Sequence, residues 1–398
     1  MANAMAGCGC QPLSSIGQNK IFGSIVLNNR SRLKSPTVAK RDSLSRAAFV
    51  FLVEIERHCM HTRTSTLRHD GTGVSIHTPL LIPSFSSKGF ARAKADDKSE
   101  IGKILEASGE FLTEAFLISA YDVAYGHIPP PRELPYKPEL IFLDSGGYEI
   151  STDRDYSSVI DPLPAPHPWN QAKLQAVIDD WPDEIPLVIV SYDHHDDRKP
   201  MAKQVAAARK LFKKYPQHLH LLLLKPETET QTLIEEAAKS AIADTAQLGS
   251  FDVIGVTEKE LGRSMLDRMV QIARLRLAMD DAGVKAPIHV FGSLDPVSVC
   301  LYYVSGAEIF DGLTWIRYGF DDGRCVYTHN MGVLKYGIDV RDDLVKSRAL
   351  AGNYYYLQDL QRRLREFDAT KKLEKLSPHA KLIANACDSL DTRLRRKS

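Results

Sequence analysis

Short apolar runs of strand length alternate with longer amphipathic stretches from about residue 68 onward. This alternation is typical of repeated β-strand–α-helix units. Eight runs qualify as strands: Pro79–Pro83, Phe116–Ala120, Leu140–Leu143, Leu187–Tyr192, Leu219–Leu224, Phe251–Val256, Ile288–Phe291 and Glu308–Phe310. Helical patterns fill the gaps, around 96–108, 170–180, 200–214, 228–247, 258–282 and 295–304. Asp295 followed by Pro296 is a typical helix start.

The strand runs indicate a parallel sheet. Val188–Val190 and Leu221–Leu224 are continuously apolar, as expected of strands that are buried on both faces. Eight such units over about 250 residues predict an α/β fold of the (β/α)₈ TIM type. An open doubly wound sheet is the alternative. It is disfavoured because no Gly-x-Gly-x-x-Gly sequence follows the first strand.

The remainder of the chain flanks this repeat. Residues 1–60 are rich in Ser, Asn, Lys and Arg with weak periodicity, so we predict an N-terminal extension there. Residues 61–398 then form the barrel domain, including C-terminal helices. We expect an irregular insertion over 317–350, followed by a helical tail from Asn353.

Composition narrows the class of protein. A hydrophobic content of 43% in 398 residues supplies material for a large core. The formal net charge of +1 gives no support for a nucleic-acid partner, which would need a local basic patch. The 6 cysteines are scattered without a Cys-x-x-Cys pair, which favours reduced thiols in the cytoplasm. No apolar run is long enough to span a membrane, and no metal or cofactor is expected.

Three of the predicted strands end in an aspartate: Asp144, Asp193 and Asp311. In a (β/α)₈ barrel, function lies at the carboxyl ends of the strands. A single aspartate there is often a helix N-cap, but three on one face favour an active site. The segment 145–147, Ser-Gly-Gly, lets a flat polar ligand approach the backbone, and Tyr148 can stack on it. The His-His-Asp-Asp segment at 194–197 is interpreted as a solvated loop, because adjacent residues point in different directions.

Six ordered motifs resemble those of the queuine/archaeosine tRNA-guanine transglycosylases, from about residue 68 to 367 with one gap. The most specific is Leu143–Tyr148, which is similar to the Asp-Ser-Gly-Gly-aromatic motif of that family. The others are Thr78–Pro83, Val190–Asp193, Ile254–Val256, His289–Gly292 with Pro296, and Gly306–Asp311. Arg317 falls close to the arginine of the family's Pro-Thr-Arg.

The sequence also departs from this family. The Cys-x-Cys-x-x-Cys and later His of its zinc subdomain are absent, and only Cys325 and His329 lie in that region. Glu149 replaces a Gln, Lys225-Pro226 replaces Gln-Gly, and Val256 replaces the second Gly of a Gly-Gly turn. Trp315-Ile316-Arg317 stands where the family has Pro-Thr-Arg.

The resemblance implies a base exchange that replaces guanine by a 7-deazaguanine through a covalent intermediate. It makes Asp311 the nucleophile and Asp144 the general acid and base. The other implied base-binding residues are Asp193, Ser145, Gly146, Gly147, Tyr148, Gly255 and Val256. Asp193 would accept hydrogen bonds from the base, and the backbone of Gly255 and Val256 would serve its exocyclic oxygen. Phosphate contacts could come from Arg317 and the tail residues Arg362, Arg363 and Arg365, although any one such arginine is more often a solvated surface charge.

Four functional hypotheses follow. The first is exchange in tRNA, as in queuosine-type tRNA modification. The second is the same 7-deazaguanine modification in DNA, favoured by the missing zinc ligands. The third is a non-catalytic partner subunit, disfavoured because Asp144 and Asp311 are both present. The fourth is an unrelated barrel hydrolase. The partners are therefore tRNA or DNA and a free 7-deazaguanine base, and a homodimer stays open.

Overall fold

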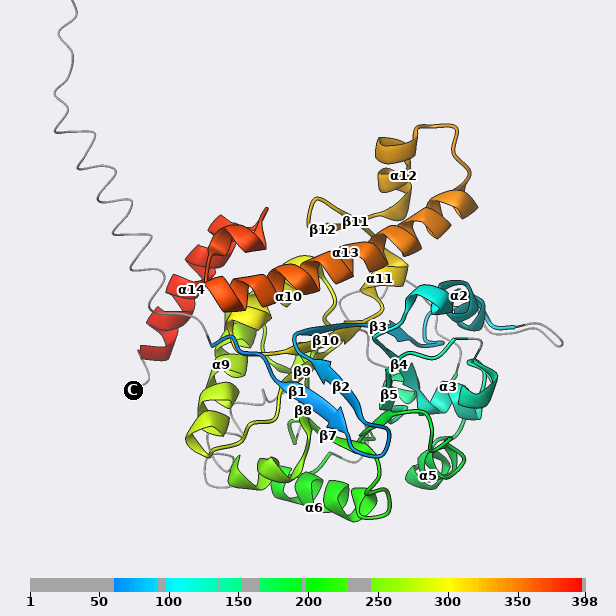
Figure 1. The fold of residues 1–398 in the computed structure, drawn as a ribbon, viewed down its shortest axis with the longest axis vertical. Coiled ribbons are helices and arrows are strands. Elements are labelled where there is room, and N and C mark those ends of the chain that lie inside the picture. Colours follow the sequence, from blue (N-terminus) through cyan, green and yellow to red (C-terminus); the bar gives the residue numbers. More distant parts are fainter. Residues whose placement is uncertain are drawn as a thin grey trace, which may run out of the picture. The chain divides into compact units, whose positions relative to one another are not determined.

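Eight parallel strands form a closed barrel in the computed structural model (Figure 1). In chain order they are β3 (Leu80–Phe85), β4 (Ala115–Ser119), β5 (Leu140–Asp144), β6 (Leu187–Val190), β7 (Leu219–Leu224), β8 (Val253–Thr257), β9 (Ile288–Phe291) and β10 (Ile309–Gly312). β10 closes the barrel by pairing with β3, which sets Asp311 beside Ile82. All eight predicted strands are present, so the (β/α)₈ architecture is confirmed.

The structure describes residues 61–91, 98–134, 136–151, 165–194, 198–227 and 245–395. The predicted N-terminal extension, residues 1–60, lies outside the described residues. So do most of the predicted helix at 228–247 and residues 195–197 of the His-His-Asp-Asp segment.

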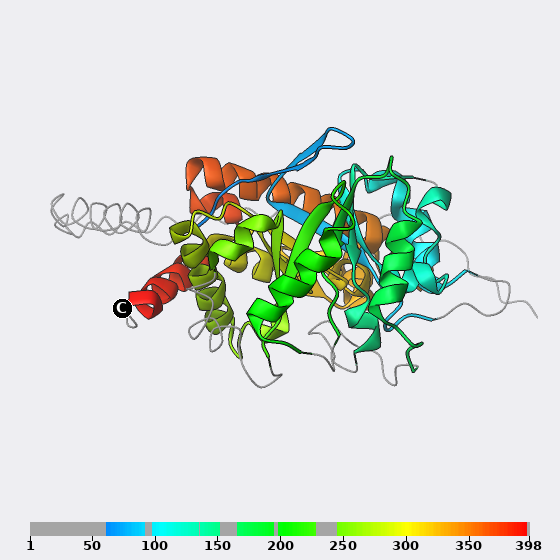
Figure 2. The ribbon, with the colours of Figure 1, turned by 90° about the horizontal axis from the view of Figure 1, so that it is seen from below.

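Helices surround the barrel (Figures 1 and 2). They are α2 (Glu100–Ser108), α3 (Ala120–Ala124), α4 (Gly147–Ile150), α5 (Gln171–Asp179), α6 (Met201–Phe212), α9 (Met265–Asp281), α10 (Pro296–Val304), α11 (Thr314–Arg317), α12 (Thr328–Tyr336), α13 (Asp342–Thr370) and α14 (Ala380–Arg395). Short 3₁₀ turns occupy Gly109–Phe111, Pro131–Glu133, Thr245–Ser250, Glu258–Glu260 and Leu373–Leu376. The predicted start of α10 is confirmed, because Asp295 accepts hydrogen bonds from the backbone of Val297 and Ser298 at 3.0 Å.

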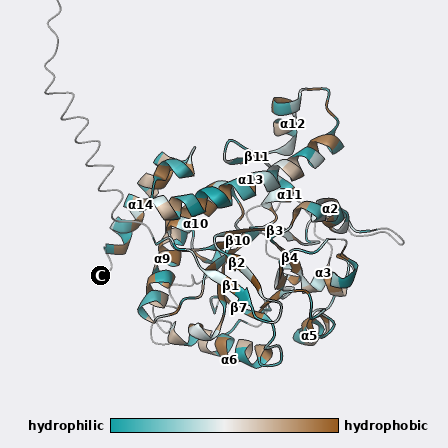
Figure 3. Cartoon of the chain, viewed as in Figure 1, coloured by the Kyte–Doolittle hydropathy of each residue, from teal (hydrophilic) through white to brown (hydrophobic). Residues whose placement is uncertain are grey.

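Side chains alternate along each strand between the barrel interior and the layer beneath the helices, with the period of two that a strand dictates. On β5, Leu140 and Phe142 belong to the interior cluster, whereas Ile141 and Leu143 belong to the larger cluster under the helices. In Figure 3 the helices around the barrel carry both hydrophilic and hydrophobic residues, and the strands that they enclose are more hydrophobic. This register places Asp144, two residues after Phe142, on the inner side of the barrel.

A β-hairpin closes the amino end of the barrel. Its strands, β1 (Thr66–His69) and β2 (Val74–His77), pair antiparallel immediately before β3. Leu67 and Ile76 of this hairpin are buried in the same cluster as the barrel interior. The hairpin therefore covers the end opposite to the strand ends that carry the aspartates.

The prediction of an irregular stretch over 317–350 was wrong. It contains a hairpin of β11 (Gly319–Asp321) and β12 (Arg324–Val326), then α12 and the first turns of α13. Each hairpin strand has 3 residues, which is too short for a hydrophobic period to show. α13 begins at Asp342 rather than Asn353, and its first turns bury only Val345 and Ala349, so they lack a strong apolar stripe.

α13 occupies the place of the eighth outer helix, against β3 and α10. Gln361 on this helix accepts a hydrogen bond from the backbone N–H of Leu81 at 2.8 Å. Asn353 binds the loop after β10, accepting from Phe320 N and donating to Trp315 O and Tyr318 O, each at 2.7 Å. Within the described residues, no helix is long and apolar enough to cross a membrane.

Candidate active site

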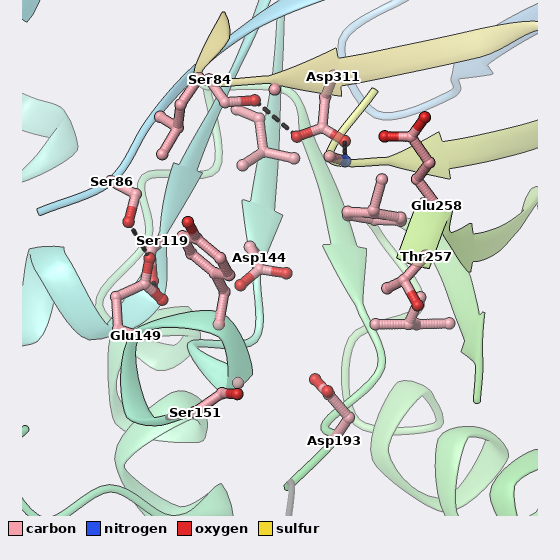
Figure 4. Close-up of a pocket in the computed structure, with 18 of the residues that line it drawn as sticks. Ser84, Ser86, Ser119, Asp144, Glu149, Ser151, Asp193, Thr257, Glu258 and Asp311 are labelled. Atoms are coloured by element: carbon pink, nitrogen blue, oxygen red, sulfur yellow. Dashed lines mark hydrogen bonds between the residues drawn. The ribbon is translucent and has the colours of Figure 1, made fainter. Parts of the chain in front are cut away.

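A cavity opens at the carboxyl ends of the barrel strands (Figure 4). It encloses about 1000 Å³ of empty space, a volume that includes its opening to solvent. The lining comes from the carboxyl ends of the strands or from the residues that follow them, and it includes Ser84, Ser119, Asp144, Asp193, Lys225, Thr257, Phe291 and Asp311. The walls also contain apolar side chains, which are Phe85, Leu117, Leu223 and Leu313. The three aspartates predicted from the strand ends therefore meet in one cavity.

Asp311 is fixed by hydrogen bonds from three directions. Ser84 Oγ donates to Oδ2 at 2.6 Å, and the backbone N–H of Gly292 donates to Oδ1 at 3.3 Å. His289 Nε2 lies 3.0 Å from Oδ1, and it must carry the hydrogen when Asp311 is ionised, because a carboxylate only accepts. His289 is fully buried and stacks on Phe291 with ring centroids 4.0 Å apart. These three contacts therefore fix the position of the Asp311 carboxyl group in the cavity wall.

Asp144 lies in a setting that favours its protonated form. Its side chain is buried, and the backbone N–H of Gly146 donates to Oδ2 at 3.0 Å. Burial raises the pKa of Asp144 well above its ordinary value, and the nearby charges of Glu149, Asp193 and Asp311 raise it further. The hydrogen bond from Gly146 opposes this shift but does not reverse it. A protonated carboxyl in a cavity can donate a proton to a departing group.

Asp193 lies in surroundings that favour its ionised form, in contrast to Asp144. Burial alone would raise its pKa, but the ammonium of Lys225 and a hydrogen bond from Ser145 Oγ lower the pKa overall. Lys225 Nζ lies 2.7 Å from Asp193 Oδ2, and this carboxylate in turn raises the pKa of Lys225. Gly147 makes room for the carboxylate, since a Cβ there would lie 2.6 Å from Asp193 Oδ1. Asp193 is therefore an ionised acceptor beside a charged donor.

Glu149 is a further buried carboxyl in the cavity wall. It accepts hydrogen bonds from Ser86 Oγ and, at 2.6 Å, from Ser119 Oγ. Burial and then the charge of Asp122 raise its pKa from 4.5 to about 7, against the effect of the two serines. Glu149 thus changes its ionisation near neutral pH in the same cavity as Asp144.

Tyr148 lies at the edge of the cavity between two cations. Lys88 Nζ lies 4.3 Å from the centre of its ring and donates at 2.8 Å to the carbonyls of Tyr148 and Ser151, at the end of α4. Arg317 Nη2 lies 3.5 Å from the Tyr148 hydroxyl and donates to Lys88 O at 3.1 Å. The predicted phosphate contact, Arg317, is therefore beside the predicted stacking residue.

Four of the predicted base-binding residues are placed differently. Ser145 and Gly146 do not line the cavity; they support Asp193 and Asp144 through the hydrogen bonds given above. Gly255 and Val256 pair with strands on both sides, so their backbone lies within the barrel ladder rather than in the cavity lining. A Cβ at Gly255 would lie 2.7 Å from the Phe291 ring, so this glycine provides room for Phe291.

The predicted phosphate role of the tail arginines is not supported by their positions. Arg362 pairs with Asp359 and Glu366 on its own helix. Arg363 donates to Ser377 O at 2.6 Å. Arg365 donates to the carbonyls of His77 and Pro79, which precede β3 at the amino end of the barrel. Arg363 and Arg365 therefore attach α13 to neighbouring segments, and Arg365 does so at the end of the barrel opposite to the cavity.

Several cavity residues were missed by the sequence interpretation, namely Ser84, Ser119, Lys225, Thr257 and Glu258. A signal was present for most of them. Lys225 continues the inward series Leu219, Leu221 and Leu223 at a period of two. His289 interrupts an apolar strand in the same way. By contrast, no sequence pattern indicates that Ser84 would meet Asp311.

Among the described residues, no group of three or more His, Cys, Asp and Glu side chains is placed to hold a metal ion. No known protein-family model matches the chain, and no curated protein sequence matches it. The fold and the cavity define a (β/α)₈ barrel with a carboxylate-rich site at the carboxyl ends of its strands.

Proposed function

We propose that this protein is a pentosyltransferase that exchanges guanine in a nucleic acid for a free 7-deazaguanine. Asp311 attacks C1′ of the target nucleotide while the glycosidic C–N bond breaks and Asp144 gives its proton to the departing base. Asp144 then takes the N9 proton of the incoming base, whose N9 attacks C1′ and releases the Asp311 carboxylate. The overall reaction is balanced and needs no cofactor.

One observation carries the proposal: Asp144 and Asp311 line the same cavity in different settings. Asp144 has a raised pKa that suits an acid, whereas Asp311 is held by Ser84, His289 and the Gly292 N–H, as a positioned nucleophile requires. The sequence resemblance supports the same two roles. The apolar walls and Tyr148 suit a flat base.

The proposed nucleic acid is tRNA, modified in the cytoplasm. The target nucleotide must leave its stack to enter such a cavity, and Arg317 at the edge would contact its phosphate. DNA is the second candidate, because the zinc ligands of the tRNA-directed family are absent from the sequence and a short hairpin with α12 follows β10 instead. A homodimer stays open and is tested by light scattering of the purified protein.

The test uses tritiated 7-deazaguanine with either tRNA or duplex DNA. Wild type is compared with Asp311→Ala, and with Asp281→Asn as a control at an exposed aspartate. A denaturing gel of the reaction with nucleic acid, before free base is added, detects the covalent intermediate. We expect label in tRNA for wild type and the control, and neither label nor adduct for Asp311→Ala.

Each other outcome has a distinct meaning. Incorporation of label into DNA alone would identify DNA as the substrate. Exchange by Asp311→Ala at the wild-type rate would refute the nucleophile assignment. Absence of label and adduct with both nucleic acids would refute the enzyme proposal and favour a partner subunit.

A further inference from the structure

Glu149 is a buried carboxyl group of the cavity wall that the proposed chemistry does not use. It lies on α4, shortly after Asp144 in the chain, and both residues line the cavity with exposed fractions of 9% and 8%. Gly146 adopts a left-handed conformation between them, with a φ of 90°, in the turn that leads from β5 into α4. Figure 4 shows Glu149, its two serines and Asp144 in the same part of the cavity. Two acidic side chains therefore share one strand–helix connection beside the site of reaction.

The Glu149 carboxyl group is fixed by two neutral donors. Ser119 Oγ donates to Oε2 at 2.6 Å, and Ser86 Oγ donates to Oε1. Ser119 of β4 pairs in register with Asp144 of β5, so this contact holds Glu149 beside the strand end that carries Asp144. A protonated carboxyl group keeps acceptor capacity for hydroxyl donors, so Glu149 can stay in this place in either charge state.

Two further carboxylates act on Asp144, and both have close partners. The Asp193 carboxylate lies 2.7 Å from the ammonium of Lys225, whose opposite charge weakens its effect at a distance. Asp311 lies 3.0 Å from His289 Nε2, and it raises the pKa of Asp144 less than burial, Glu149 or Asp193 does. Neither carboxylate is therefore the main charge that acts on Asp144.

The negative charge of Glu149 is not compensated in this way. Glu149 forms no ion pair within the described ranges of the chain, where its partners are hydroxyl groups. The ammonium of Lys88 is directed to two backbone carbonyls of α4 and the residue after it, each 2.8 Å away. The charge that acts on Glu149 is that of Asp122 on α3, which has the same sign. After burial, Glu149 is accordingly the largest cause of the raised pKa of Asp144.

We propose that Glu149 is a positioning residue whose negative charge holds the proton on Asp144 above neutral pH, and so extends the pH range in which Asp144 can act as an acid. The acid role rests on the proposed function, whereas the effect of one carboxyl group on the other does not. Once Asp144 has given its proton to the departing base, two carboxylates face each other. Their repulsion favours the return of a proton to Asp144 from N9 of the incoming base. Glu149 acts through its charge and touches no reacting atom.

The first measurement needs no nucleic acid. Protein labelled with carbon-13 at the aspartate carboxyl carbons is titrated by NMR, and Asp144→Asn identifies the signal of Asp144. Glu149→Gln removes the charge and keeps both serine contacts, Glu149→Asp retains a carboxylate, and Glu110→Gln is a control at an exposed position. We expect the titration midpoint of Asp144 to fall by about 1 pH unit in Glu149→Gln. It should stay close to wild type in Glu149→Asp and in the control.

The second measurement follows formation of the covalent adduct with tRNA in a single turnover, without free base. Asp144 must be protonated in this step, so the rate falls at alkaline pH as its proton is lost. For Glu149→Gln, the loss relative to wild type should grow from less than about 2-fold near pH 6 to about 10-fold on the alkaline side. The loss is small near pH 6 because Glu149, with a pKa of about 7, is then mostly protonated and Gln resembles that form. A purely structural role would lower the rate by the same factor at every pH.

The possible failures are distinguishable. An unchanged midpoint of Asp144 in Glu149→Gln would overturn the inference, whether or not base exchange is found. An equally large fall in Glu149→Asp would also overturn it, because packing rather than charge would then be the cause. A lower midpoint in Glu149→Gln alone, with no adduct on tRNA or DNA, would support the inference and refute the proposed function. If urea unfolding shows that Glu149→Gln is not folded, Glu149→Ala removes the same charge, and an unchanged midpoint there would overturn the inference.

Discussion

Replacing Glu149 with Gln should change how the stability of this protein depends on pH. Glu149 is buried in the cavity wall, where burial and then the charge of Asp122 raise its pKa from 4.5 to about 7. Gln has nearly the same shape and can still bind both serines, accepting from one hydroxyl and donating to the other. The substitution therefore removes an ionisation with little change in packing.

The magnitude follows from proton linkage. Because the pKa is higher in the folded state, that state binds more protons than the unfolded state between pH 4.5 and 7. The contribution of Glu149 to the stability of wild type is therefore fully present below pH 4.5. It is lost as the pH rises to about 7, and the loss levels off above that pH. A pKa difference of about 2.5 corresponds to about 3 kcal/mol, of which about 2.5 kcal/mol is lost between pH 5 and pH 8.

Urea unfolding at pH 5 and pH 8 tests this reasoning. The unfolding free energy of Glu149→Gln, measured relative to wild type, should rise by about 2.5 kcal/mol between the two pH values. Glu110→Gln, at an exposed position, is the matched control and should follow wild type. Parallel curves for Glu149→Gln and wild type would refute the assignment of the raised pKa to Glu149.

Three further predictions concern the site and its support. Gly147→Ala places a Cβ within 2.6 Å of Asp193 Oδ1, so we expect the KM for the free base to rise at least about 10-fold with a smaller change in kcat, measured in the exchange assay. Ser84→Ala removes the 2.6 Å hydrogen bond to Asp311, and the base-exchange rate should fall about 10-fold as the nucleophile loses its position. Asn353→Ala removes three hydrogen bonds to the backbone, two of them buried, and urea unfolding should show a loss of about 3 kcal/mol.

Matched controls accompany these variants. Gly249→Ala should be neutral, because a Cβ there meets only Val284 at 3.7 Å. Ser389→Ala and Asn385→Ala change exposed positions of α14 and should leave exchange and stability close to wild type. Equal effects at test and control positions would show that the contacts of Gly147, Ser84 and Asn353 do not carry the predicted roles.

The sequence by itself determined the barrel and the location of its site. All eight strands were found because buried parallel strands read as apolar runs, and their alternation with helical patterns fixes the fold class. The site followed from the same pattern, since the last inward-facing position of a strand points into the mouth of a barrel. Asp144 and Asp311 both occupy such positions. Periodicity failed in the 317–350 stretch, where strands of 3 residues and a largely exposed start of α13 show no apolar period.

Only the tertiary structure decided which side chains meet. Ser84 and Asp311 are 227 positions apart, yet closure of the barrel by β10 and β3 brings them within 2.6 Å. The strand period assigns each residue to a face, but it does not show its partners across the barrel. The pairing of Lys225 with Asp193 arises in the same way, from neighbouring strand ends, and it changes an expected lone acceptor into an ion pair. Charge state follows burial and neighbours, so the raised pKa of Asp144 and the lowered pKa of Asp193 were beyond the reach of sequence.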